Sequence, residues 1–139
     1  MSLFRTFKTD DEKEKSGVPV TYGPNDDGSV PTFIVRRRGP TNQQYAKQLT
    51  RETEPYRRQM ELNTLDEMVS RAILMKVFVE TVLVGWSNVQ DQNNQPIVFS
   101  RENALSLFRT LPELYDDLLA QSAKLSLFRS ETAEQERKN

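Results

Sequence analysis

Residues 65–86, in the middle of the chain, are apolar on almost every face that a helix would present. Apolar residues recur at three- and four-residue spacing from Leu65 onward, and further apolar residues fill most of the other faces. Lys76 and Glu80, four residues apart, leave only a narrow polar stripe. A helix that is apolar nearly all round is buried, either inside the protein or in an assembly. We therefore predict a buried central helix from Leu65 to about Trp86.

The boundaries of this helix rest on local signals. Thr64, with Glu67 three residues later, matches a capping box and predicts the N-terminal end of the helix. The β-branched run Val77–Val84 could instead form a strand, because periodicity alone does not separate a short buried strand from a buried helix. A strand over this run therefore remains the alternative for the second half.

Two further helices are expected after a polar loop at residues 91–95. Ser100 is a good N-cap for a helix over residues 101–110. Pro112 suits the first turn of the last helix, which we expect to reach about Phe128. Each of these two helices has an apolar stripe at helical spacing, which predicts that both pack on the core.

The N-terminal half of the chain predicts a β-hairpin. Two short strands, residues 18–22 and 31–36, flank residues 23–28, which are dense in turn formers. Pro19 lacks the N–H that a strand ladder needs, so we expect the first strand at a sheet edge. A lone hairpin is only marginally stable in water, so this one must pack on the helices or pair with another chain.

A helix is expected directly after the hairpin. Thr41 or Asn42 can cap it, and it should run to about Glu54. Pro55 then interrupts or kinks the helix. Residues 56–63 are either a continuation of the helix or a connector, and both alternatives stay open.

Both ends of the chain are rich in charged residues. Residues 1–17 form a charged arm, which we expect to be mobile in isolation, and residues 130–139 form a charged tail, which we expect to be frayed. Three apolar side chains near the start of the arm could dock on a partner or a neighbouring subunit: Leu3, Phe4 and Phe7. The sequence thus predicts a mainly α fold of about four helices with a small N-terminal β-hairpin, forming a single domain over residues 18–129 between flexible termini.

The composition argues against an enzyme. The chain has no His and no Cys, which excludes disulfides, thiolate nucleophiles, Cys/His zinc sites and imidazole acid–base catalysis. The five glycines are scattered and match neither Gly-rich phosphate-binding fingerprint. Asp116 and Asp117 are adjacent, so on a helix they point about 100° apart and do not converge on one substrate bond. We therefore expect no catalytic residues, no cofactor and no metal.

The sequence also lacks the signals of export or membrane insertion. The N-terminus has no uninterrupted apolar core of a secretory signal. The longest apolar run, residues 72–84, is broken by charges and falls short of the ~20 residues that a membrane span needs. The absence of Cys fits a reducing cytoplasm. We expect a cytoplasmic protein that does not bind membranes.

A basic cluster, Arg36–Arg38, offers an alternative function. Clustered guanidinium groups suit phosphate, and on a strand Arg36 and Arg38 would share one face. A small regulatory nucleic-acid-binding protein is therefore the alternative. Acidic residues within the segment 10–27 and a net charge of −1 argue against a nucleic-acid footprint. We favour a solvated strand end or ion pairs with a protein partner.

Two groups of short patterns remain, and neither contains catalytic residues. One is Phe33-Ile34-Val35 with Arg36, Gly39 and Asn42-Gln43-Gln44-Tyr45; the other is Gly85-Trp86, the Asp/Asn-rich loop, Pro96–Ser100 and Glu102–Leu105. They resemble the N-terminal strand and first helix, and then the C-terminal half, of the tail assembly chaperones of long-tailed, non-contractile bacteriophages. Asn94-Gln95 departs from this family, in which a Gly is common at that loop turn.

The resemblance implies an α-helical assembly factor in the cytoplasm of the bacterial host. Such chaperones bind the long helical tape measure protein, keep it soluble and recruit major tail tube subunits around it. They leave before the tail is mature, so they are not part of the virion. The nearly all-apolar central helix also suggests a homo-oligomer, partner binding or both.

The surface that contacts the tape measure protein can be predicted from the aromatic residues. Trp86 and Tyr115 carry a polar group and lie near expected helix ends, where interface anchors often sit, whereas core packing is the stronger alternative for Phe108. The predicted contact residues are Trp86, Phe99, Phe108, Leu111 and Tyr115. Alanine at Trp86 or Tyr115 should then weaken partner binding and leave the fold intact.

Overall fold

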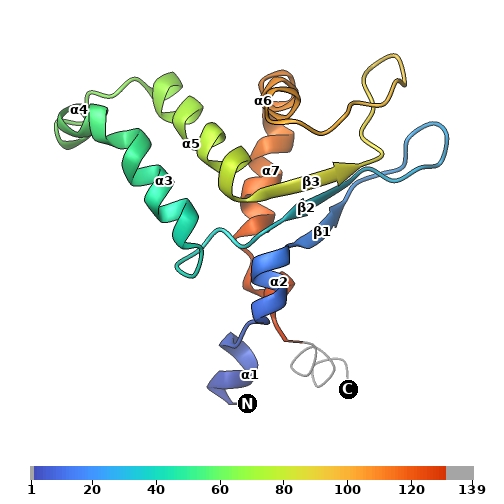
Figure 1. Cartoon of the computed structure of the whole chain (residues 1–139), viewed down its shortest axis with the longest axis horizontal. Coiled ribbons are helices and arrows are strands. Elements are labelled where there is room, and N and C mark those ends of the chain that lie inside the picture. The colour runs from blue at the N-terminus through green and yellow to red at the C-terminus, as the bar shows by residue number, and fades with distance from the viewer. Residues whose placement is uncertain (1, 131–139) are drawn as a thin grey trace.

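The predicted hairpin is part of a three-stranded antiparallel sheet in the computed structural model, which describes residues 2–130 (Figure 1). β1 (Val18–Thr21) pairs with β2 (Thr32–Val35), which confirms the hairpin. β3 (Leu83–Ser87) pairs with the other side of β2. The strand order β1-β2-β3 places β1 at an edge, as the proline at position 19 predicted.

Helical segments precede and follow these strands along the chain. They are α1 (Leu3–Phe7), α2 (Asp11–Ser16), α3 (Gln43–Thr53), the 3-10 helix η1 (Glu54–Tyr56), α4 (Arg57–Glu61), α5 (Glu67–Thr81), α6 (Arg101–Thr110), α7 (Pro112–Ser122) and the 3-10 helix η2 (Leu125–Phe128). Asn42 caps α3 and Ser100 caps α6, which confirms two predicted helix starts. Pro112 is in the first turn of α7, also as predicted.

The expectation of a mainly α fold with only a hairpin is wrong, because the protein mixes helices with a three-stranded sheet. The central helix ends at Thr81 and not near Trp86, and the chain continues as β3. Phe33 pairs with Trp86 and Ile34 with Gly85, so the open edge of β2 supplies the partner that turns this segment into a strand. The alternative strand over residues 77–84 was right only for its last residues.

Two other helix boundaries also differ from the predictions. Asp66, not Thr64, caps α5 and accepts the backbone N–H of Met68 at 2.8 Å. The Thr64 hydroxyl instead donates to the carbonyl of Gln59. The last helix ends at Ser122, and η2 follows as a separate short element. Both α5 and α7 are therefore shorter than their apolar patterns predicted. The spacing of apolar residues does not determine the exact residue at which a helix begins or ends.

The helices cover one face of the sheet and form one core with it. Alternate residues of β1 and β2 are buried, which is the period of two that a half-covered sheet requires. In Figure 1, α7 passes behind the sheet and α6 lies above it, while α3 and α5 lie side by side at one end of the sheet. The core consists of Val18, Val20, Phe33, Val35, Met75, Phe78, Val79, Val82, Leu83, Val89, Ala104, Phe108, Tyr115, Leu118 and Phe128.

The charged N-terminal arm contains α1 and α2. Its second helix is tied to the rest of the protein, because the backbone N–H of Asp10 donates to the carbonyl of Phe128 at 2.8 Å and Thr9 forms a β-bridge with Arg129. The expected mobility of the arm stays a prediction. From residue 131 onward the predicted charged tail lies outside the described residues. Within residues 2–130, no helix combines the length and apolarity needed to cross a membrane.

Candidate partner-binding site

Trp86 and Phe99, two of the five predicted contact residues, form a half-buried pair beside the sheet. Their ring centroids are 5.0 Å apart in an edge-to-face arrangement, and Trp86 also meets Phe33 at 5.7 Å. The indole N–H of Trp86 donates to the carbonyl of Ile97 at 2.8 Å. The polar group of Trp86 therefore holds the segment before α6 against β3, which is a role inside the protein.

Phe108 and Tyr115 lie in a second aromatic cluster at the centre of the core. Both meet Phe78, at centroid distances of 6.0 and 5.5 Å, and their exposed fractions are 0% and 1%. Leu111, between α6 and α7, is 48% exposed and belongs to neither cluster. The five predicted residues therefore form two separate aromatic pairs and one isolated leucine, and they do not form a single surface. Their contact with a partner stays a prediction.

The adjacent acids of α7 serve two different contacts. Asp116 forms an ion pair with Arg71 at 2.9 Å. Asp117 accepts a hydrogen bond of 2.6 Å from the Tyr22 hydroxyl, which links α7 to the end of β1. Burial of Tyr22 and this hydrogen bond raise the pKa of the Tyr22 hydroxyl. The two carboxylates do not converge, and the described residues contain no cluster of three or more candidate metal ligands.

The arginine triplet after β2 joins three helices to the sheet. Arg37 pairs with Glu14 of α2 at 2.8 Å, Arg36 donates to Gln44 of α3 at 3.3 Å, and Arg38 donates to the carbonyl of Leu119 in α7 at 3.4 Å. Because β2 ends at Val35, the expected alternation of faces does not extend to these residues. The triplet therefore stabilises the junction between α2, α3 and α7.

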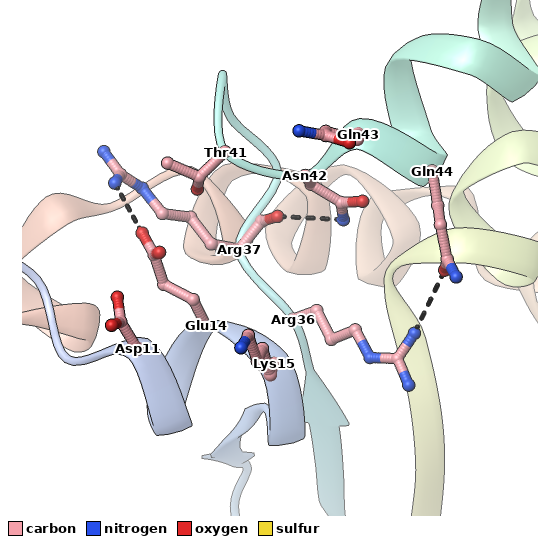
Figure 2. Close-up of a pocket in the computed structure, with 9 residues that line it drawn as sticks. All are labelled: Asp11, Glu14, Lys15, Arg36, Arg37, Thr41, Asn42, Gln43 and Gln44. Carbon is pink, nitrogen blue, oxygen red and sulfur yellow. Dashed lines mark hydrogen bonds and ion pairs between the residues drawn. The ribbon is translucent and has the colours of Figure 1, made fainter.

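Figure 2 shows the polar hollow around this junction, which has a volume of about 470 Å³. Arg36 and Arg37 extend away from each other across it, and Asp11 and Glu14 also line it. A phosphate group needs donors that converge on it and few carboxylates nearby. This arrangement does not favour the nucleic-acid alternative.

Glu14 makes this junction sensitive to acid. Burial raises the pKa of Glu14, but hydrogen bonds from Arg37, Thr9 and Thr41 and the charge of Arg37 outweigh it, so the pKa lies below its ordinary value of 4.5. A lowered pKa in the folded state contributes stability above the unfolded pKa, and that contribution is lost as the pH falls through the folded pKa.

We expect the stability difference between the wild type and Glu14→Gln to be full at neutral pH and to shrink below about pH 4.5. The reason is that the protonated carboxyl loses its charge-assisted hydrogen bond to Arg37. Urea unfolding at a series of pH values measures this difference. A difference that stays constant down to about pH 3 would contradict the assigned role of Glu14.

An apolar groove lies between α5 and α6, and residues of η1 and of the start of α7 also line it. Its volume is about 740 Å³. We call it the α5–α6 groove; its lining residues are Tyr56, Met68, Val69, Arg71, Ala72, Ile73, Met75, Lys76, Leu105, Phe108, Arg109 and Pro112. In Figure 1, α5 lies between α3 and α6, so the groove follows the side of α5 that faces α6.

Apolar side chains remain accessible along this groove. Met68, in the first turn of α5, is 81% exposed, and Ala72, one turn later, is also exposed. Val69, Ile73 and Leu105 are only half-buried. An apolar surface that runs along a helix and is not covered within the fold is typical of a protein-binding site.

The N-terminal helix α1 presents a second apolar surface. Leu3, Phe4 and Phe7 are 76%, 78% and 61% exposed. They line a hollow of about 410 Å³ together with Lys8. The sequence had indicated this trio as a possible docking element, and the structure leaves all three side chains accessible.

Of the residues that line the groove, sequence reasoning named only Phe108 as a binding candidate, and it missed the exposed ones. Met68, Val69 and Ala72 follow the helical spacing of the central apolar stripe, so the pattern assigned them to the core. The usable signal was the excess of apolar faces on this helix, which one small domain does not cover.

Comparison with known proteins finds a matching family model. A family model described as YdaY prophage protein matches residues 40–139, which span α3 through η2 and continue to the end of the chain. The matched segment includes every residue that lines the α5–α6 groove, whereas α1 and the sheet hairpin precede it. No curated protein and no solved structure matches the chain.

Proposed function

Because the chain belongs to the YdaY prophage protein family and is thus phage-derived, we propose that it is a tail assembly chaperone. It would bind the tape measure protein, recruit major tail tube subunits around it and leave before the virion is complete. The proposal combines the phage origin with the resemblance of the sequence to tail assembly chaperones. It describes a cytoplasmic binding protein of the bacterial host with no catalytic activity and no cofactor.

The α5–α6 groove is the observation that carries this proposal. A long helical protein such as a tape measure exposes apolar residues at helical spacing until the tail tube covers them. A groove lined by Met68, Ile73 and Leu105 can bury such residues from one helix. Each large side chain that is fully buried contributes about 1.5–3 kcal/mol, so three anchors supply about 4.5–9 kcal/mol toward the roughly 8.2 kcal/mol of micromolar binding, and further contacts must offset the cost of association.

Release follows from the same contacts. If the tube subunits cover the apolar stripe of the tape measure protein, they compete with the chaperone for the same residues. The chaperone then leaves without chemical energy, because its binding is only a burial of apolar surface. The exposed apolar side chains of α1 are suited to self-association, which light scattering on the purified protein would detect.

Replacing Met68 and Ala72 by glutamine should lower the affinity for the tape measure protein by about tenfold or more. Both positions are exposed and glutamine is a good helix former, so the fold should be unaffected. Co-purification and titration with the tape measure protein from the same phage measure the effect. Neither substitution changes the charge of the groove.

Val98→Gln is the matched control. Val98 is 76% exposed, a similar fraction to Met68, and it does not line the groove. This variant should bind normally. Normal binding by the Met68/Ala72 variant as well would show that the groove is not the site, and a wild-type chain that does not bind the tape measure protein would contradict the proposed function itself.

A further inference from the structure

The charged residues that line the α5–α6 groove are all cationic. They are Arg71 and Lys76 on α5 and Arg109 on α6, and no acidic residue between positions 2 and 130 lines the groove. The chain as a whole has a net charge of −1, so a lining whose charged residues are all cationic does not reflect the composition. A groove with an apolar floor and a cationic rim distinguishes between possible helical occupants by their charge.

These cations are available to an incoming partner. The side chain of Arg109 has no ion-pair or hydrogen-bond partner among residues 2–130. Arg71 pairs with Asp116 and Lys76 with Glu52, but the side chains of both cations remain almost half exposed. Surface pairs of this kind contribute only about 0–1 kcal/mol, so a carboxylate from a partner can replace or share them.

The chain's own apolar helix is a poor occupant. α1 carries Leu3, Phe4 and Phe7. The charged residue within this helix, Arg5, is basic, and so is Lys8, which directly follows the helix. Insertion of α1 from a second copy would therefore place like charges at the rim, which opposes binding. An occupant that fits both the floor and the rim carries acidic residues beside its apolar stripe, and α1 does not.

We infer that the α5–α6 groove recognises an acidic amphipathic helix, whose apolar stripe packs on Met68, Ala72 and Leu105 while flanking Asp or Glu side chains meet Arg71, Lys76 and Arg109. The lining on α5 runs from Met68 to Lys76, about 12 Å along the helix axis. The contact therefore covers about two turns of the partner helix. This inference rests on the proposed function and names the chemistry of the tape measure segment that binds there.

The test uses two labelled synthetic helical peptides with the same leucine stripe, one flanked by Glu and the other by Lys, and the full-length protein. Fluorescence anisotropy should show the Glu peptide binding about tenfold or more tightly than the Lys peptide at low salt. Raising the ionic strength from about 0.05 M to about 0.5 M should reduce this preference, because added salt screens exposed charges.

Arg109→Glu should weaken binding of the Glu peptide by about three- to tenfold, since it turns an attraction into a repulsion at the rim. Arg51→Glu is the matched control, because Arg51 is exposed on α3 and does not line the groove. The control changes the net charge by the same amount and should leave the preference unchanged.

Equal binding of both peptides, tighter binding of the Lys peptide, or binding of neither would overturn the inference. So would Arg109-dependent binding to vesicles of anionic lipid in place of the Glu peptide. Equal binding that disappears in the Met68/Ala72 glutamine variant leaves the proposed function standing, because the groove then binds helices without regard to charge. If the wild-type chain does not bind the tape measure protein, the proposed function itself is contradicted.

Discussion

Replacing Tyr115 by alanine is expected to lower the free energy of unfolding by about 3–5 kcal/mol. Tyr115 is 1% exposed and packs against Phe78 and Phe108, and the guanidinium group of Arg71 lies 5.4 Å from its ring centroid. Alanine would leave a cavity at the centre of the core, where the neighbours are held by other contacts. A domain of this size has a total stability of about 5–15 kcal/mol, so the variant would be close to unfolding.

Tyr115→Phe separates the ring from its hydroxyl. The hydroxyl is buried and has no hydrogen-bond partner among the described residues, and its burial raises the pKa of Tyr115 to about 12. Removing an unpaired buried hydroxyl relieves a desolvation cost, so this variant should be as stable as the wild type or up to about 1–2 kcal/mol more stable. Urea unfolding compares the three proteins. A loss of more than about 1 kcal/mol in Tyr115→Phe would show that the hydroxyl does have a partner.

This result bears on how partner binding can be tested. The sequence predicted that alanine at Tyr115 would affect a partner and leave the fold intact, because a tyrosine at a helix end is a common interface anchor. The structure places this residue in the core, so weaker partner binding by Tyr115→Ala would not distinguish a lost contact from a lost fold. Met68 and Ala72 can be changed without that ambiguity, since both are exposed.

Local signals predicted the elements that local chemistry determines. Asn42 and Ser100 cap helices because their side chains accept backbone N–H groups three residues ahead, and this can be read from a few residues. The hairpin followed from its turn-forming residues for the same reason. The change from helix to strand after Thr81 could not be predicted in this way. It depends on the free edge of β2, which lies about fifty residues earlier in the chain.

The candidate site was less predictable than the fold, because burial is a non-local property. Met68 and Met75 both follow the apolar spacing of α5, yet Met68 is 81% exposed and Met75 only 6%. The difference arises because other elements cover the second half of α5 and leave its first turns open. The indole of Trp86 was similarly ambiguous, since its N–H could serve a partner or, as the structure shows, the carbonyl of Ile97.

Gly17→Ala is expected to lower the free energy of unfolding by about 2–5 kcal/mol. Gly17 ends α2 with φ +92° and ψ 168°, a backbone conformation that is essentially restricted to glycine. A Cβ atom there would lie 2.9 Å from Cγ2 of Ile34 and 3.0 Å from the carbonyl oxygen of Val35. The backbone of β2 is held by strands on both sides, so it cannot move away. The substitution would therefore separate α2, and with it the Glu14–Arg37 pair, from the sheet.

Gly28→Ala is the matched control, because Gly28 has a similar φ of +87° but a Cβ atom added there would have no neighbouring atom within 4 Å. Only the backbone strain should appear there, about 1–2 kcal/mol. Unfolding in urea measures both variants, and the excess loss in Gly17→Ala reports the close approach of α2 to β2. Equal losses would mean that the arm does not rest on the sheet in solution. In that case Glu14→Gln should also lose its pH-dependent effect, because the same docking brings Glu14 to Arg37.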